Sequence, residues 1–69
     1  MKLKQEIYDL ILSDSVLQAE IVKASGGSSF SSVRRWAINQ DEKLCNYSIL
    51  QAILSYLSSY SSVDELLQK

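Results

Sequence analysis

The chain has two glycines, adjacent as Gly26–Gly27, and no proline. Before this pair, apolar residues from Leu17 onward recur at helical spacing, and after it a run of serines precedes a second apolar pattern around Val33. Glycine readily takes the left-handed conformation that ends a helix, and Ser28 or Ser29 can cap the helix that follows. The spacing therefore predicts two helices, over 15–25 and 29–38, that cross steeply as a helix-turn-helix.

The same periodicity predicts which residues of these two helices face the core. The inward sets are Leu17, Ile21 and Ala24 in the first helix, and Phe30, Val33 and Ala37 in the second. Trp36 falls at the edge of the second set, so we expect it to be a half-buried packing residue rather than a stacking platform for a base. Ser15 and Gln18 have the spacing of a capping box at the start of the first helix.

Further helices are expected on either side of this pair. The spacing predicts an amphipathic helix over 3–12, with its apolar stripe at Leu3, Ile7, Leu10 and Ile11. The polar segment 39–46, which contains Cys45, is predicted to be an exposed loop. A fourth helix begins at Asn46 or Ser48 and carries a stripe in which Leu54 is central, formed by Leu50, Ile53, Leu54 and Leu57.

The C-terminal segment predicts a fifth, short helix. Ser62 and Glu65 have capping-box spacing, and they precede the apolar residues Val63, Leu66 and Leu67. No segment alternates with the period of two that a strand requires. The expected fold class is therefore all-α, with five helices in a single domain over residues 1–69.

Size and composition limit what such a domain can do. A chain of 69 residues has no room for a separate catalytic domain. With no histidine and one cysteine, Cys45, it has neither a disulfide nor a ligand set for structural zinc, and no side chain to activate the thiol. We therefore expect a cytoplasmic protein that is not an enzyme and has no cofactor, no membrane segment and no small-molecule substrate.

The helix pair resembles a known family. Residues that match its first helix and turn glycine are Gln18, Ala19, Glu20, Ile21, Lys23, Ala24 and Gly26, and residues that match the end of its recognition helix are Val33, Arg35 and Trp36. On these positions the chain is similar to the lambda-repressor-like (Cro/repressor, XRE-type) DNA-binding domains, although its turn is one residue longer and Ser25 replaces the usual leucine. The resemblance implies a five-helix domain that binds specific DNA sequences, with Gln18 holding a phosphate.

The residue chemistry of the second helix of the pair is compatible with a DNA groove. If its apolar face is inward, its outward positions are Ser28, Ser31, Ser32, Arg34, Arg35 and Ile38. Serine hydroxyls at a helix N-terminus can bond phosphates or base edges, and arginine can contact guanine bidentately. The candidate DNA-binding residues are Gln18, Lys23, Ser28, Ser29, Ser31, Ser32, Arg34 and Arg35. In the alternative interpretation the serines only cap and solvate the helix, and both arginines pair with surface acids.

Two functions from different classes remain open. The first is a small transcriptional regulator that binds double-stranded DNA as a homodimer, because one short helix with two arginines supplies few contacts. The second is a protein-interaction module, such as an antitoxin-like or adaptor domain, with the same fold and no DNA affinity. The net charge of −1 favours the second, and the adjacent Arg34 and Arg35 favour the first.

Overall fold

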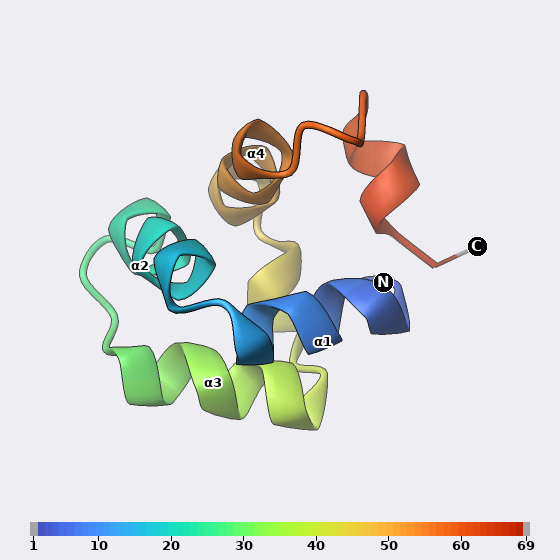
Figure 1. The fold of residues 1–69 in the computed structure, drawn as a ribbon. Coiled ribbons are helices and arrows are strands. Elements are labelled where there is room, and N and C mark those ends of the chain that lie inside the picture. The colour runs from blue at the N-terminus through green and yellow to red at the C-terminus, as the bar shows by residue number, and fades with distance from the viewer. Residues whose placement is uncertain (1, 69) are drawn as a thin grey trace.

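The computed structural model describes residues 2–68. This part of the chain contains four α-helices and two short 3-10 helices. In chain order they are α1 (Gln5–Ser13), α2 (Ser15–Ala24), α3 (Phe30–Asn39), η1 (Glu42–Cys45), α4 (Tyr47–Tyr56) and η2 (Val63–Leu66). Figure 1 shows α2 and α4 nearly end-on, while α1 and α3 lie across the view beneath them. The predicted all-α class is confirmed for these residues, whereas the fifth α-helix is not found.

Helices α2 and α3 are separate and cross steeply, as the glycine pair predicts (Figure 1). Gly26 and Gly27 both have positive φ, 83° and 108°. The N–H of Gly27 donates to the carbonyl oxygen of Val22 at 3.2 Å, and the N–H of Gly26 donates to that of Lys23 at 3.3 Å. This is the Schellman arrangement, which satisfies carbonyls that the end of α2 would otherwise leave without partners.

The cap of α2 differs from the predicted capping box. Asp14, not Ser15, precedes the helix, and its Oδ1 accepts hydrogen bonds from the N–H groups of Val16 and Leu17 at 3.0 and 3.2 Å. Gln18 does not reach back to the cap. Its amide Nε2 donates instead to the carbonyl oxygen of Ile11 at 2.7 Å, across the corner between α1 and α2.

The core-facing side of α1 differs from the predicted stripe at two positions, and that of α3 differs at one. In α1 the buried side chains are Ile7, Tyr8 and Ile11, and Leu10 is 37% exposed. Tyr8 is tolerated in the core because its hydroxyl accepts a hydrogen bond from the N–H of Leu3 at 3.0 Å.

In α3, Val33 and Ala37 are buried as predicted, but Phe30 is 51% exposed. The first turn of α3 extends beyond the end of α1 and faces only α2 and the glycine turn (Figure 1). Phe30 is therefore on the same side of α3 as Val33 and Ala37, but little of the neighbouring structure covers its side chain. Trp36 is half-buried and packs against the core, which confirms the packing expectation.

The segment predicted as an exposed loop is wrong in part, because it contains η1. Leu44 is fully buried, and η1 lies between the C-terminal end of α3 and the start of α4. Cys45 is half-buried against the core, and burial raises the pKa of its thiol. Asn46 caps α4 through its Oδ1, which accepts from the N–H of Ser48 at 2.9 Å.

The buried face of α4 is formed by Ile49, Leu50 and Ile53. Leu54, predicted to be central, is only half-buried at the edge of this face. The buried face is rotated relative to the predicted stripe because α4 packs against α2 and also against both 3-10 helices, η1 and η2. The core centre on α4 is therefore Ile53, which is fully buried.

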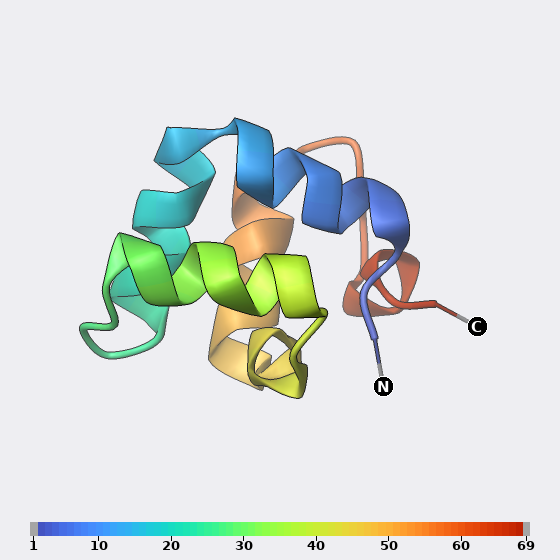
Figure 2. The same cartoon turned by 90° about the horizontal axis from the view of Figure 1, so that it is seen from below.

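The predicted fifth helix is the four-residue η2, and its predicted capping box is absent. Ser62 makes no side-chain cap bond, whereas Glu65 accepts hydrogen bonds from the N–H and the hydroxyl of Ser61 at 3.0 and 2.8 Å. After η2, Leu67 pairs with Leu3 in an isolated antiparallel bridge. The N–H of Gln68 also donates to the carbonyl oxygen of Lys2 at 2.8 Å, and Figure 2 shows the first and last described segments close together.

All helices contribute to one hydrophobic core among the described residues. Its buried members are Leu3, Ile7, Tyr8, Ile11, Leu17, Ile21, Val33, Ala37, Leu44, Ile49, Leu50, Ile53 and Leu66. Ala24 packs against this core while remaining partly exposed. Within residues 2–68, no helix combines the length and the apolar character that crossing a membrane requires.

Candidate nucleic-acid interface

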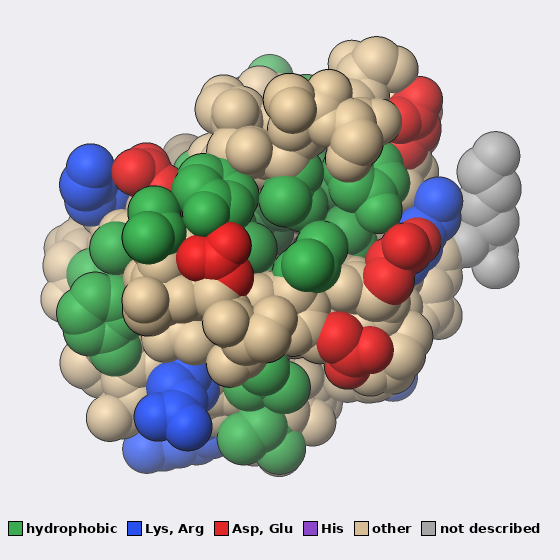
Figure 3. Space-filling model, in the orientation of Figure 1, with side chains coloured by type: hydrophobic (Ala, Val, Ile, Leu, Met, Phe, Trp, Pro, Cys, Tyr) green, Lys and Arg blue, Asp and Glu red, His purple; other side chains and the backbone are tan. Residues whose placement is uncertain are grey.

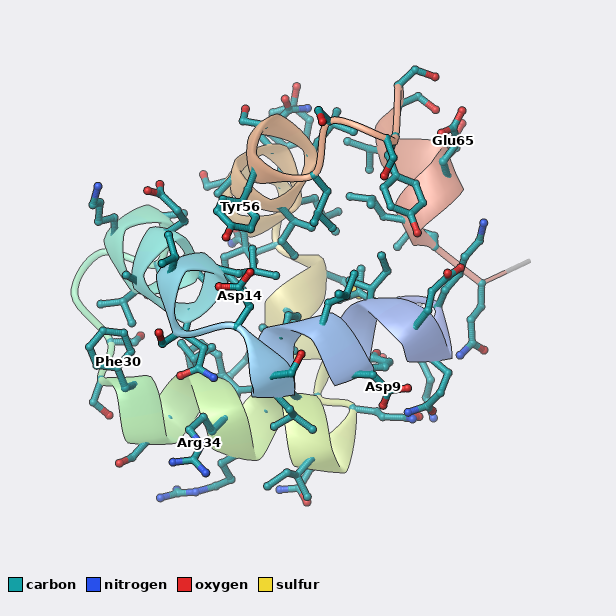
Figure 4. All side chains as sticks on the ribbon, viewed as in Figure 1. Asp9, Asp14, Phe30, Arg34, Tyr56 and Glu65 are labelled. Atoms are coloured by element: carbon teal, nitrogen blue, oxygen red, sulfur yellow. The ribbon has the colours of Figure 1, made fainter. Side chains whose placement is uncertain are left out.

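The outer side of α3 is not covered by any other described element, and it faces the reader in Figure 2. Ser31, Arg34, Arg35 and Ile38 surround one shallow hollow on this side. Their spacing follows from the burial of Val33 and Ala37, because residues three and four positions apart share a helix face. Figure 4 shows Arg34 projecting from α3 away from the rest of the molecule.

The two arginines carry positive charge that no acidic side chain of residues 2–68 neutralises by contact. Neither Arg34 nor Arg35 forms an ion pair or a hydrogen bond with another described residue. Helix α3 itself contains no Asp or Glu. The alternative in which both arginines pair with surface acids is therefore wrong for this part of the chain. Two exposed guanidinium groups are available to an anion or to the edge of a base.

The serines at the start of α3 divide into two kinds. Ser29 is the N-cap: its hydroxyl accepts a hydrogen bond from the N–H of Ser32 at 3.1 Å and donates to the Ser32 hydroxyl at 3.0 Å. Ser28 is half-buried, and its N–H donates to the hydroxyl of Ser25 at 3.3 Å. Ser28, Ser29 and Ser32 thus have local structural roles, while the exposed Ser31 lies at the hollow beside the arginines.

Gln18 is not placed to hold a phosphate. Its side chain is 7% exposed, and its amide is bonded to the backbone of α1. The family pattern puts this residue at the start of the helix, where it would be accessible. Here it is the fourth residue of α2, because the helix begins at Ser15 after the Asp14 cap. We therefore omit Gln18 from the interface.

Lys23 lies apart from the two arginines. Its Nζ is 3.5 Å from the Oε1 of Glu20, and its side chain is 74% exposed. It is in the last turn of α2, whereas both arginines are in α3. Figure 3 shows basic side chains in separate groups rather than in one patch on this face. The predicted residues therefore form one basic site on α3 and a separate, partly neutralised lysine.

A depression next to the glycine turn was not predicted. It is lined by residues of the turn together with Trp36, Lys43, Asn46 and Ser48. The Nζ of Lys43 lies 5.7 Å from the centroid of the Trp36 ring, within the range of a cation–π contact. No local sequence signal indicates this contact, because it requires η1 to fold back against α3.

Comparisons of the chain with protein-family models, with curated proteins and with solved structures gave no match. Among residues 2–68, no group of His, Cys, Asp or Glu side chains is arranged to hold a metal ion.

Proposed function

We propose that this chain is a sequence-specific DNA-binding protein that inserts α3 into the major groove of double-stranded DNA. The observation that carries the proposal is the exposed side of α3, where Arg34 and Arg35 stand without acidic partners among residues 2–68. The major groove admits an α-helix and presents acceptor atoms that arginine contacts bidentately. In this proposal the chain is a small cytoplasmic transcriptional regulator, and its activity is binding without catalysis.

In the proposed arrangement α2 and α3 are the two helices of a helix-turn-helix in a lambda-repressor-like domain. Helix α3 is the recognition helix, and α2 crosses above it next to the DNA backbone. The glycine turn and the Ser29 cap support this assignment because they hold the two helices at a steep angle. Helix η2 takes the place of the last helix of that family.

The proposed contacts follow from exposure. Ser31, Arg34 and Arg35 meet base edges or phosphates in the groove, and the backbone N–H groups after Ser29 attract a phosphate at the start of α3. Lys23 contacts the DNA backbone only where a phosphate replaces Glu20 as the ion-pair partner of its Nζ. A single helix of this length supplies few contacts, so we propose that the chain binds as a homodimer on two half-sites.

The charge of the whole chain favours a second candidate, a protein-interaction module. The net charge is −1, whereas DNA-binding domains usually carry a basic surface. Two exposed apolar side chains, Val16 at 55% and Phe30 at 51%, also suit a protein partner. The two candidates differ in one measurable property, the retention of duplex DNA at low salt.

The test is a binding-site selection on random duplexes at low salt. We expect a site to be enriched by the native chain and not by the double variant Arg34→Ala/Arg35→Ala. A charge-matched control, Lys2→Ala/Lys4→Ala, removes two positive charges from the segment before α1, which does not line the hollow, and should retain the site. Loss of binding in the first variant alone would assign the effect to α3 rather than to net charge.

The single variants separate the roles of the two arginines. If an arginine contacts a base, replacing it by Ala should cost ~1–3 kcal/mol of binding free energy on the selected site and relax discrimination there. If an arginine contacts only phosphate, replacing it by Ala should weaken binding to all sequences alike. It should also lower the slope of log affinity against log salt concentration by about one unit. If no duplex is retained at low salt, the DNA-binding proposal is wrong, and the protein-interaction module becomes the better candidate.

A further inference from the structure

Ile38 is an exposed apolar side chain beside the two arginines of α3. It is 66% exposed, more than any other Ile, Leu, Val or Phe in residues 2–68. It stands four residues after Arg34 and seven after Ser31, so these three side chains share a helix face. The same hollow is lined by Ile38 and by Ser31, Arg34 and Arg35. A ligand that enters this hollow would therefore contact Ile38 as well as the arginines.

The chemistry of Ile38 restricts which base pair it can contact favourably. Serine and arginine match the acceptors and donors at base edges, but the isoleucine side chain has no polar atom. In the major groove, the apolar group that distinguishes one base from another is the C5-methyl group of thymine. Contact between this methyl group and Ile38 removes apolar surface of both partners from water.

We propose, on the basis of the DNA-binding function above, that Ile38 determines specificity by packing against the C5-methyl group of a thymine. Seven residues of helix rise about 10 Å, which corresponds to about three base-pair steps. The thymine read by Ile38 therefore lies within about three base pairs of the positions contacted by Ser31 and the arginines. The ligand class is a duplex that combines a guanine or phosphate contact with this neighbouring thymine.

The experiment exchanges thymine for deoxyuridine, one position at a time, in the site obtained by selection. Deoxyuridine keeps the pairing edge and lacks only the C5-methyl group. At one thymine position we expect the affinity of the native chain to fall about fourfold, the equivalent of one buried methyl group. The variant Ile38→Ala should bind the thymine and deoxyuridine duplexes equally at that position.

Val16→Ala is the matched control, because Val16 is also exposed and apolar but lies on α2 and does not line the hollow. This variant should still discriminate thymine from deoxyuridine. If no exchange weakens binding, or if Ile38→Ala discriminates as well as the native chain, the assignment of Ile38 is wrong while DNA binding stands. If no duplex is selected at all, the proposed function and this inference fail together.

Discussion

Asp14 lies between α1 and α2 and connects them to α4 through its side chain. Its Oδ1 caps α2, and its Oδ2 accepts a hydrogen bond from the hydroxyl of Tyr56 at 2.7 Å (Figure 4). The hydrogen bond from the Tyr56 hydroxyl is the largest cause that lowers the pKa of Asp14 below its usual 3.8, and the hydrogen bond from the N–H of Leu17 is the second. A carboxyl group with a lower pKa in the folded chain stabilises the fold above its unfolded pKa, and this contribution is lost as the pH falls through the folded value.

We therefore expect Tyr56→Phe to lower the Tm near pH 7, where Asp14 is ionised in both states. The difference from the native chain should be smaller near pH 2, because the carboxyl group loses its charge as the pH falls through its folded pKa. Thermal unfolding followed by circular dichroism at both pH values measures it. Tyr47→Phe, at the exposed start of the same helix, is the control and should show no such pH dependence. An equal loss of Tm at both pH values would mean that Asp14 is not the group responsible.

At the scale of elements, the junction of α2 and α3 depends on backbone conformation rather than on packing. A Cβ atom added at Gly27 would meet no atom within 4 Å, but the φ of 108° is one that L residues rarely adopt. Gly27→Ala should therefore destabilise the fold by ~1–2 kcal/mol, measured by urea denaturation. The loss should appear without any change in the residues that form the core.

A D-alanine at position 27, introduced by chemical synthesis of the chain, adds the same methyl group with the opposite handedness. Because D residues favour positive φ, this chain should be at least as stable as the native one. Equal destabilisation by L- and D-alanine would show that the methyl group itself, and not the left-handed turn, is the cause.

At the scale of the whole molecule, one small core holds all the helices, so the loss of a central side chain affects the entire chain. Ile53 is fully buried, whereas Leu54 is half-buried. Ile53→Ala should cost ~2–5 kcal/mol, which is a large part of the total stability expected for a domain of this size. Urea denaturation should show a smaller loss for Leu54→Ala, and an unfolded Ile53→Ala chain would also agree with this expectation. A larger loss for Leu54→Ala would restore the face predicted from the sequence.

The sequence by itself determined the features that depend on a few neighbouring residues. Gly26 and Gly27 mark the end of α2, and the observed caps Ser29 of α3 and Asn46 of α4 are each one of the two candidates predicted. These residues act through their own backbone angles or through hydrogen bonds within a few residues. The exposed arginines of α3 were predicted for the same reason, since helical periodicity places them outside the buried face of Val33 and Ala37.

The tertiary structure decided which residues of each helix lie under a neighbour. Periodicity gives the phase of a helix but not the position at which another element crosses it. The buried Gln18, Tyr8 and Leu44 and the exposed Phe30 therefore differ from expectation. The polar atoms of the first two are satisfied by backbone groups outside their own helices, seven and five residues away, and helical periodicity does not reveal these contacts. Ile38 was among the predicted outward positions, but its place in one hollow with both arginines emerged only from the folded chain.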